Sequence, residues 1–352
     1  MKSRIKRLAV SGMTGSAFYV SSPSDVFYLS GFSGTFGRIV ATQKKSYFIT
    51  DPRYAAAVRK SAIEKNFEVV VTKNFKKDLL KLLSKTKTVL LGNSTGLQDY
   101  LYLKETKKVE INSSVMNMRL IKDPSEITLI KKAIIINESG IRHITSILKP
   151  GVSEKDLALE FDYYTRKKGA DSLSFDPIVA FGSNSAVPHH KTSIAKLKKN
   201  TFILIDCGVK YKGYCSDLTR CISFGIIGAH FKAIQKHYNM VKNAKEAGLK
   251  AYKSGSLIRQ ADAKTRFFLK KHGELDKFFT HSLGHGMGID VHEPPAVNVK
   301  EKTRFKPGMV LSCEPGIYIE DSYGIRIEDD YLITAGGPEK MGTLSDGLII
   351  KD

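Results

Sequence analysis

The chain has 352 residues, with 56 Lys and Arg against 35 Asp and Glu, and therefore a net charge of +21. Its hydrophobic content of 42% and charged content of 26% are ordinary for a globular protein, which excludes collagen-like, disulfide-scaffold and wholly disordered chains. The length exceeds what one hydrophobic core usually supports, so we expect two domains. The positive charge would suit a nucleic-acid or anionic-membrane partner, or a surface that is simply rich in lysine.

The compartment is predicted from the cysteines and from the absence of long apolar runs. The four cysteines form no C-x-x-C pair, and three of them lie close together, so we expect free buried thiols in a reducing compartment. The basic N-terminus contains an apolar run at residues 8–10 that is too short for a signal-peptide core. No stretch approaches the run of about 18 apolar residues that a membrane span needs. We therefore expect a cytoplasmic protein with no membrane partner.

The N-terminal third of the chain predicts an α/β domain. Residues 17–50 alternate short apolar runs with turn residues, including the run VFYLS, which is typical of strands joined by tight turns. Residues 53–66 and 74–85 have helical character, and the segments KTKTVLLG and KKVEIN read as strands. Strands mixed with helices over about 115 residues indicate an α/β domain.

A domain boundary is predicted at residues 119–127, RLIKDPSEI, where Asp123 can cap a helix whose first turn contains Pro124. The elements expected after this boundary are, in chain order, helices at 125–148 and from Ser153 to about Lys168, a β-hairpin at 201–224, helices at about 228–252 and 255–272, and strands with Gly and Pro turns over 278–350.

Acidic and histidine side chains interrupt these predicted strands. Asp206 ends the apolar run FILI, and Asp217 lies eleven residues later on the second arm of the predicted hairpin. Two strands joined by a short turn can bring both carboxylates together, where they repel each other unless a cation neutralises them. The remaining members of this set are His281, His285, His292, Glu314 and Glu328.

Two aspartates, two glutamates and one histidine would form a carboxylate-rich metal site. Hard oxygen ligands with one nitrogen suit Mn²⁺, Co²⁺, Fe²⁺ or Zn²⁺ better than a thiolate-type zinc site would. Four negative charges exceed what one divalent ion needs and match two ions that share bridging carboxylates. Each of these residues alone would more often be a cap or a packed core side chain, but the ordered set predicts a dinuclear site.

The ordered motifs DCG, YCSDLTR, HSLGHGMGIDVHE, EPGIY and GIRIEDD resemble the proline-specific peptidases of the pita-bread metallopeptidase family. These are Xaa-Pro aminopeptidases and Xaa-Pro dipeptidases, or prolidases. The resemblance covers about residues 119–345, and YLSGFSGTFG and YFITDPRY resemble the smaller domain of that family. It implies a ribonuclease-H-like, creatinase/prolidase-type α/β domain at residues 1–118 and an α+β pita-bread catalytic domain at residues 119–352.

The resemblance implies a metal-binding role for five residues. Asp206 would bind one metal ion, His285 and Glu314 would bind the second, and Asp217 and Glu328 would bridge the two. A water molecule between two divalent ions loses a proton near neutral pH and becomes a nucleophile. The implied cofactor is therefore a pair of divalent ions, with Mn²⁺ favoured and Co²⁺, Zn²⁺ or Fe²⁺ as alternatives.

Catalytic roles follow from the same resemblance. His189, in VPHHKT, would line the site and hydrogen-bond the substrate or shuttle protons, and His292 would be the other imidazole beside the scissile bond. Glu314 would also accept the proton of the attacking water. Arg326 would orient ligands and the substrate.

Substrate-binding roles are expected for His281, Tyr318 and Phe181. His281 would be a pocket histidine, and Tyr318 would orient the substrate beside Arg326. Phe181 would contact the proline ring. Core packing is the alternative for Phe181, and packing or a backbone hydrogen bond is the alternative for His281, Tyr318 and His190.

The two activities of this family differ in what they must bind. A dipeptidase must hold the free carboxylate of the proline, which requires a cation. Some prolidases place an arginine a few residues after the histidine that His292 matches, whereas this chain reads EPPAVN there. The motifs FSGTFG and FITDPRY also resemble the aminopeptidase branch. We therefore expect an Xaa-Pro aminopeptidase that acts on proline-containing peptides, with an Xaa-Pro dipeptidase as the alternative.

Three other classes fit less well. Creatinase-like enzymes and non-catalytic relatives of this fold lack the full ligand set, which is complete here. A specific nucleic-acid partner is not expected, because the chain has no interleaved basic and aromatic motif and no phosphate-binding loop.

The resemblance also implies a homodimer.

Overall fold

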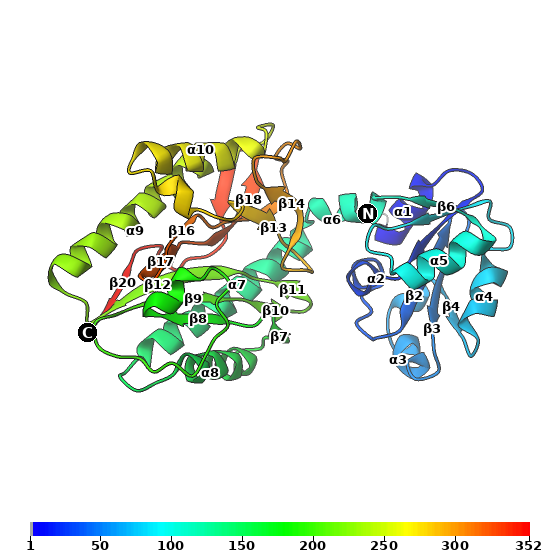
Figure 1. The fold of residues 1–352 in the computed structure, drawn as a ribbon. Helices are drawn as coiled ribbons and strands as arrows, with labels where there is room; N and C mark the ends of the chain where they lie inside the picture. Colours follow the sequence, from blue (N-terminus) through cyan, green and yellow to red (C-terminus); the bar gives the residue numbers. More distant parts are fainter. Residues whose placement is uncertain (1–2) are drawn as a thin grey trace. The chain divides into compact units, whose positions relative to one another are not determined.

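The structure, a computed structural model, describes residues 3–352 and divides into two compact units between Arg119 and Leu120 (Figure 1). We call them the N-terminal unit and the C-terminal unit and describe each by itself.

The N-terminal unit is built on a six-stranded mixed sheet with the strand order β4-β3-β2-β1-β5-β6. Strand β2 runs antiparallel to β1 and β3, and the other neighbouring strands are parallel. The strands are β1 (Ser16–Val20), β2 (Gly37–Thr42), β3 (Ser46–Thr50), β4 (Glu68–Val71), β5 (Thr88–Leu91) and β6 (Lys108–Ile111). The helices are α1 (Arg4–Ser11), α2 (Pro23–Ser30), α3 (Ala55–Arg59), α4 (Phe75–Leu82), α5 (Leu97–Thr106) and α6 (Ser114–Leu120).

Helix α2 corrects the prediction for the run VFYLS at residues 26–30, which is helical and not a strand. Pro23 lies in the first turn, where the missing N–H has no helical partner to lose. Gly31 ends the helix at a φ of 76°, and its N–H donates to the carbonyl of Phe27. These two end signals outweigh the strand-like composition between them.

The C-terminal unit contains two larger sheets, ordered β20-β12-β9-β8 and β14-β13-β15-β18-β19, and two smaller ones, β11-β10-β7 and β16-β17. The strands of the first sheet are β8 (Ile178–Phe181), β9 (Thr201–Cys207), β12 (Leu218–Phe224) and β20 (Ile349–Lys351). Those of the second are β13 (Gly284–Gly286), β14 (Glu293–Val297), β15 (Val310–Cys313), β18 (Asp329–Thr334) and β19 (Gly337–Lys340). The small sheets consist of β7 (Ser172–Leu173), β10 (Val209–Tyr211), β11 (Tyr214–Cys215), β16 (Gly316–Ile319) and β17 (Tyr323–Arg326).

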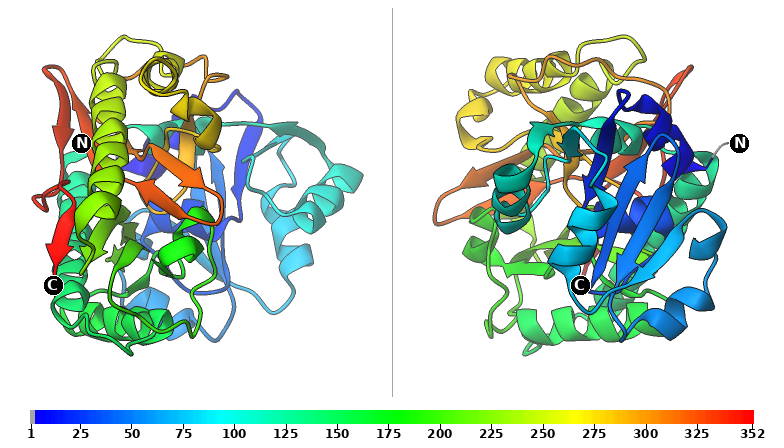
Figure 2. Two further views of the ribbon diagram at one scale, coloured as in Figure 1. Left: turned by 60° about the vertical axis from the view of Figure 1, so that its left-hand side comes forward. Right: turned by 90° about the vertical axis from the view of Figure 1, so that its right-hand side faces the viewer.

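Two helix pairs lie on opposite sides of these strands (Figures 1 and 2). One pair is α7 (Pro124–Ser146) and α8 (Glu154–Lys167), and the other is α9 (Gly228–Leu249) and α10 (Arg259–Lys271). Each pair buries an apolar cluster against the strands. None of the helices in residues 3–352 combines the length and the apolar composition that a membrane span requires.

Helix α7 begins as its sequence predicts. The carboxylate of Asp123 accepts hydrogen bonds from the N–H groups of Ser125 and Glu126. The carboxylate of Glu126 accepts in return from the N–H of Asp123, which completes a capping box. Pro124 occupies the first turn, as expected.

The hairpin predicted at residues 201–224 is confirmed, with one addition. Strands β9 and β12 pair in antiparallel register with Asp206 opposite Thr219. At their tip, β10 and β11 form a smaller hairpin around Lys212 and Gly213, which both have positive φ. This arrangement leaves Asp206 near the end of β9 and Asp217 immediately before β12.

Candidate metal centre

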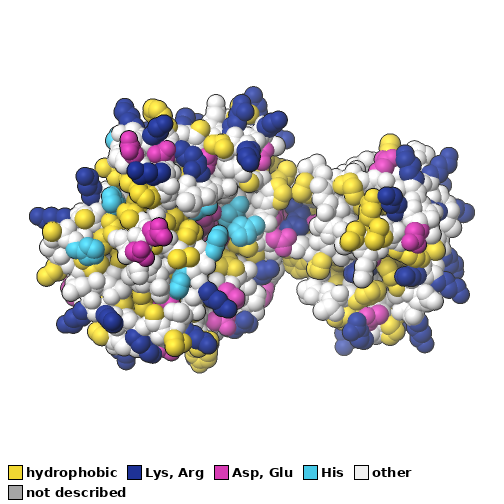
Figure 3. All heavy atoms as spheres, in the orientation of Figure 1, with side chains coloured by type: hydrophobic (Ala, Val, Ile, Leu, Met, Phe, Trp, Pro, Cys, Tyr) yellow, Lys and Arg dark blue, Asp and Glu magenta, His cyan; other side chains and the backbone are white. Residues whose placement is uncertain are grey.

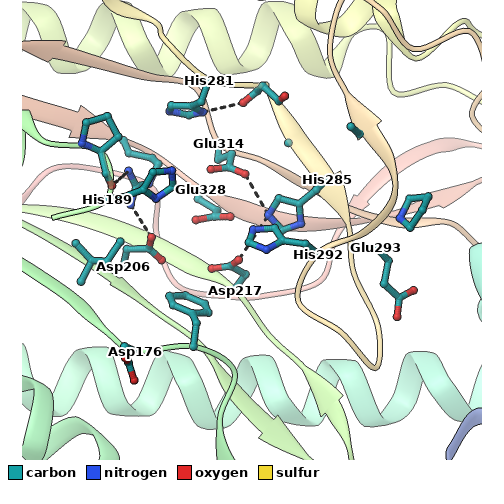
Figure 4. A pocket seen from close by; sticks show the side chains of 18 residues that line it. Asp176, His189, Asp206, Asp217, His281, His285, His292, Glu293, Glu314 and Glu328 are labelled. Carbon is teal, nitrogen blue, oxygen red and sulfur yellow. Dashed lines mark hydrogen bonds and ion pairs between the residues drawn. The ribbon is translucent and has the colours of Figure 1, made fainter. Parts of the chain in front are cut away.

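Five side chains expected to bind metal point into one space in the C-terminal unit (Figure 4). Each comes from a strand or from the residue next to one, because the strands of both larger sheets end around this space. The five are Asp206 in β9, Asp217 before β12, His285 in β13, Glu314 after β15 and Glu328 before β18.

The distances between these groups are short enough for shared ligands. The Nε2 atom of His285 lies 3.2 Å from Oε1 of Glu314 and 3.6 Å from Oδ2 of Asp217. Ligand atoms of Asp217, His285 and Glu328 all lie within 4.8 Å of one another. Asp206 lies on the far side of the group and accepts a hydrogen bond from Nη2 of Arg326.

Unpartnered oxygen atoms show that this cluster fits cations. Within residues 3–352, the buried atoms Oδ1 of Asp206, Oδ1 of Asp217 and Oε1 of Glu328 accept no hydrogen bond. A buried carboxylate oxygen without a partner is costly, and a metal ion is the partner that an all-acceptor cluster can bind. The residues present therefore fit the divalent cations that the sequence predicts.

The pKa shifts have the same origin. Burial, followed by the negative charge of Glu328, raises the pKa of Asp217 well above its usual range. Burial and the charge of Glu314 raise the pKa of Glu328 in the same way. Burial also raises the pKa of Asp206, although the guanidinium of Arg326 opposes it. These carboxylates cannot all ionise together unless a cation is added.

Glu314 behaves differently because it faces an imidazole. Burial acts to raise its pKa, but the hydrogen bond and the charge of His285 prevail and lower the pKa of Glu314 to about 2. The same contact raises the pKa of His285 against the effect of burial. Without metal, these two side chains form an internal ion pair.

Two polar neighbours, Thr219 and Asp330, contact the carboxylate of Glu328 and the backbone of Asp217. The hydroxyl of Thr219 donates to Oε2 of Glu328 at 2.7 Å and accepts from Nε of Arg326. The carboxylate of Asp330 accepts from the N–H of Asp217 at 3.2 Å, and its other oxygen has no hydrogen-bond donor among the described residues. Burial raises the pKa of Asp330 to about 8. Asp330 was missed in the sequence because the run EDD gave no reason to separate it from Asp329.

The cluster opens into a cavity of about 700 Å³. On the face drawn in Figure 3, histidine side chains gather in a hollow of the C-terminal unit. His189, His281 and His292 all line the cavity with the five residues of the candidate metal centre. Its apolar lining comes from Phe175, Ile178, Pro188, Pro294 and Ala296.

Tyr318 connects His281 to Arg326 without lining the cavity itself. The Nδ1 atom of His281 lies 2.8 Å from the carbonyl oxygen of Ser282, so it carries the proton and leaves Nε2 as an acceptor. The Tyr318 hydroxyl donates to this Nε2 at 2.8 Å and accepts from Nη1 of Arg326 at 2.7 Å. Burial raises the pKa of Tyr318 to about 12, which keeps the hydroxyl protonated.

Glu154 determines which of the neighbouring histidines His189 and His190 faces the cavity. Five hydrogen bonds reach its fully buried carboxylate, including one with Nε2 of His190 at 2.8 Å. His190 is therefore held inside the protein, and His189 faces the cavity. Phe181 lies with the apolar cluster of α7 and α8 instead of lining the cavity, and its N–H also donates to Glu154. Core packing, the alternative for Phe181, describes its position, whereas a hydrogen bond to the carboxylate of Glu154 holds His190.

A pita-bread arrangement of strands between two helix pairs, with a carboxylate-rich centre, defines a class of metallohydrolases. Residues 128–335 match metallopeptidase family M24, and residues 6–121 match the creatinase/prolidase N-terminal domain. The chain belongs to this metallopeptidase family. The predicted family, the fold class and the expectation of a metallopeptidase are therefore confirmed.

Individual relatives are similar over nearly the whole chain. The structure of an Xaa-Pro dipeptidase from Bacillus anthracis superposes with a TM-score of 0.90 at 34% identity, over 98% of both chains. That of an X-Pro aminopeptidase from Thermotoga maritima superposes with a TM-score of 0.88 at 33% identity, over 99% of both. The Xaa-Pro dipeptidase of Pyrococcus furiosus is 31% identical over 92% of each chain.

Proposed function

We propose that this chain is an Xaa-Pro aminopeptidase that uses two divalent metal ions to remove the residue preceding proline at the N-terminus of peptides. The observation that supports it most is the cluster of buried carboxylate oxygens without donors, placed beside histidines in an open cavity. Such a cluster has no structural use without cations, and the cavity has room for a short peptide.

The cations would be held by Asp206, Asp217, His285, Glu314 and Glu328. When bound, a pair of divalent ions would lower the pKa of a water molecule and polarise the scissile carbonyl group. The four carboxylates balance the charge of two such ions. Because oxygen ligands predominate, Mn²⁺ is favoured, and Co²⁺, Zn²⁺ and Fe²⁺ suit the same set.

Side chains of this cavity would stabilise developing charge and transfer protons. Burial, followed by the charge of His285, lowers the pKa of His292, so its ring is neutral at pH 7 and donates one N–H. This donor, together with His189, would stabilise negative charge that develops on the carbonyl oxygen. The ionised carboxylate of Glu314 would accept a proton from the attacking water and pass it to the departing nitrogen.

Proline suits this cavity because a bond preceding proline has no N–H to satisfy. The apolar lining offers surfaces for the ring, with Pro294 and Ala296 on one strand and Ile178 on another. A cavity whose apolar walls face buried carboxylates would therefore accept the ring without leaving an unpaired donor.

The charges that line the cavity favour an aminopeptidase over a dipeptidase. Among its described lining residues, Arg326 is the one Lys or Arg side chain. Its guanidinium donates to Asp206, Tyr318 and Thr219. These internal hydrogen bonds occupy the group, so it is not available to bind a substrate carboxylate. Ala296 stands among the positions EPPAVN, where some prolidases carry arginine. The dipeptidase is the second candidate, because relatives from Bacillus anthracis and Pyrococcus furiosus bear that name.

The test uses purified protein loaded in turn with Mn²⁺, Co²⁺ or Zn²⁺ and three peptides: Ala-Pro, Ala-Pro-Ala and Ala-Ala-Ala. We expect release of alanine from Ala-Pro-Ala and no cleavage of Ala-Ala-Ala. Cleavage of Ala-Pro alone would establish the dipeptidase instead. A lack of proline-dependent cleavage in protein shown to contain metal would overturn both candidates.

A further inference from the structure

The loop at residues 287–292 carries His292 into the cavity. It joins β13, which contains His285, to β14, and His292 is its last residue. The imidazole of His292 makes no hydrogen bond to another described residue, and its ring centroid lies 4.3 Å from that of His285. The position of His292 therefore depends on how the backbone of this loop is held.

Glu293, the residue after His292, holds that backbone. Its Oε1 atom accepts from the N–H of Ile289 at 2.9 Å and from the N–H of Asp290 at 3.1 Å. Its side chain points away from the metal-binding carboxylates (Figure 4). A methyl group at Gly288 would lie only 2.9–3.1 Å from the carboxyl atoms of Glu293, so the loop closes tightly around this carboxylate.

Lys122 completes the arrangement from a distant part of the sequence. Its Nζ atom lies 3.2 Å from Oε2 of Glu293, and the two side chains are only 2% and 4% exposed. The N–H of Lys122 donates to the carbonyl of Gly308, which fixes its backbone. The other side of the loop is held by Cys215, whose N–H donates to the carbonyl of Gly288.

A buried ion pair is a poor source of stability, because desolvation of both charges offsets their attraction. Apolar side chains of similar volume would fill this space as well, but they could not accept the two N–H groups of the loop. What the charged pair adds is a fixed loop geometry. We infer that Lys122 and Glu293 are positioning residues that hold His292 at the scissile bond, an inference that rests on the proposed function.

The first experiment measures the loop directly and needs no activity. Hydrogen exchange of the segment 287–297, followed by mass spectrometry, compares the wild type with E293Q and K122M. We expect exchange at the amides of Ile289 and Asp290 to accelerate by roughly tenfold or more, because each loses a charged acceptor or its fixed position. Unchanged exchange in both variants would overturn the inference, whatever the protein hydrolyses.

The second experiment asks whether the pair acts through His292. We expect E293Q to lower kcat for Ala-Pro-Ala by about 10- to 100-fold with a smaller change in KM, because a displacement near 1 Å can cost this much. In the H292A background the same substitution should change kcat by less than about threefold. An equally large effect of E293Q in both backgrounds would refute positioning through His292.

A matched control is the buried pair Asp25 and Arg119, where D25N removes a paired carboxylate far along the sequence from the loop. D25N should leave kcat and exchange of segment 287–297 unchanged. Wild-type protein that cleaves no Xaa-Pro peptide would refute the proposed function, and accelerated exchange in E293Q would then still establish the loop contact on its own.

Discussion

The two units bury charge in different ways. Among the described residues of the N-terminal unit, Asp25 is the one buried carboxylate, and both of its oxygens have donors, from Arg119 and Ser94. The C-terminal unit buries many carboxylates, and four of them, Asp206, Asp217, Glu328 and Asp330, keep an oxygen without a donor. Incomplete hydrogen bonding, more than burial itself, distinguishes the centre of the C-terminal unit.

The same contrast exists inside the C-terminal unit. Glu154 and Glu138 are as deeply buried as Asp217 and Glu328, yet hydrogen bonds saturate them, with Glu138 accepting from Thr343 and Leu344. These carboxylates join distant segments. In the described part of the chain, Asp217 and Glu328 each keep one buried oxygen without a donor, although Thr219 donates to the other oxygen of Glu328. Counting donors therefore separates structural from functional carboxylates.

The largest predicted effect follows from removing Asp217 or Glu328, the two carboxylates proposed to bridge the metal ions. D217A and E328A should each lower kcat/KM for Ala-Pro-Ala by on the order of 10³-fold or more, because each removes a shared ligand. Metal content, measured by mass spectrometry of the desalted protein, should fall in parallel. Turnover near that of the wild type in either variant would contradict the dinuclear assignment.

After metal removal, the stability of the folded protein should decrease as the pH rises. Burial raises the pKa of Asp330 to about 8 and those of Asp217 and Glu328 above their usual range. Groups with raised pKa values in the folded state contribute stability at pH values below their unfolded pKa, and this is lost as the pH rises through the folded value. Chelated protein should therefore lose stability between about pH 4 and pH 8, by roughly 3 °C in Tm per pH unit for each proton.

A thermal melt at each pH, with chelator and with Mn²⁺, makes this measurement. Metal should remove the decline, because bound cations favour the ionised carboxylates. The variant D217N should make the chelated protein more stable than the wild type at pH 8, since it removes one repelling charge. A Tm of the chelated wild type that rises from pH 5 to pH 8 would contradict the origin of these pKa shifts.

The described lining of the cavity lacks an uncommitted cation for a free proline carboxylate, and adding one should increase dipeptidase activity. Ala296 lines the cavity on β14, and A296R would supply an uncommitted cation to a free proline carboxylate. The ratio of kcat/KM for Ala-Pro to that for Ala-Pro-Ala should rise by about tenfold or more. The control V299R adds the same charge at a side chain that is 52% exposed and outside the cavity lining, and it should leave the ratio unchanged. An unaltered ratio in A296R would show that the carboxylate binds elsewhere.

Substitution of Tyr318 should have a smaller effect on kcat/KM. The variant Y318F leaves Nε2 of His281 without its donor and Nη1 of Arg326 without one acceptor. We expect kcat/KM to fall by roughly three- to tenfold, as loss of individual hydrogen bonds usually produces, while metal content stays the same. Loss of metal in Y318F would instead show that the tyrosine supports the ligands through Arg326.

Local sequence predicted that these acidic side chains would cluster, because their residue types contradict their surroundings. Asp206 and Asp217 interrupt apolar strands, and the hairpin that brings them together is visible in the turn between those strands. The start of α7 could also be predicted, because Asp123, a good cap, directly precedes Pro124, which suits the first turn of a helix. These features depend on neighbours in the chain.

The contacts that sequence reasoning missed depend on distant residues. Lys122 and Glu293 are separated by 171 positions, and a lysine at a domain boundary gives no sign that it is buried. Phe181 shows the reverse error, because an aromatic residue near VPHHKT fits a pocket wall as well as a core position. Only the packing of α7 and α8 against β8 decides between these alternatives.

The smallest predicted effect on activity belongs to the N-terminal unit. D25N weakens one contact to Arg119 and one to Ser94, so the free energy of unfolding should fall by about 1–3 kcal/mol. Both oxygens of its carboxylate already have donors in the protein, so metal content and kcat/KM should stay within about twofold of the wild type. Denaturant unfolding and the peptide assay measure these quantities on the same preparation. A loss of metal in D25N would show that hydrogen-bond saturation does not separate structural from functional carboxylates in this protein.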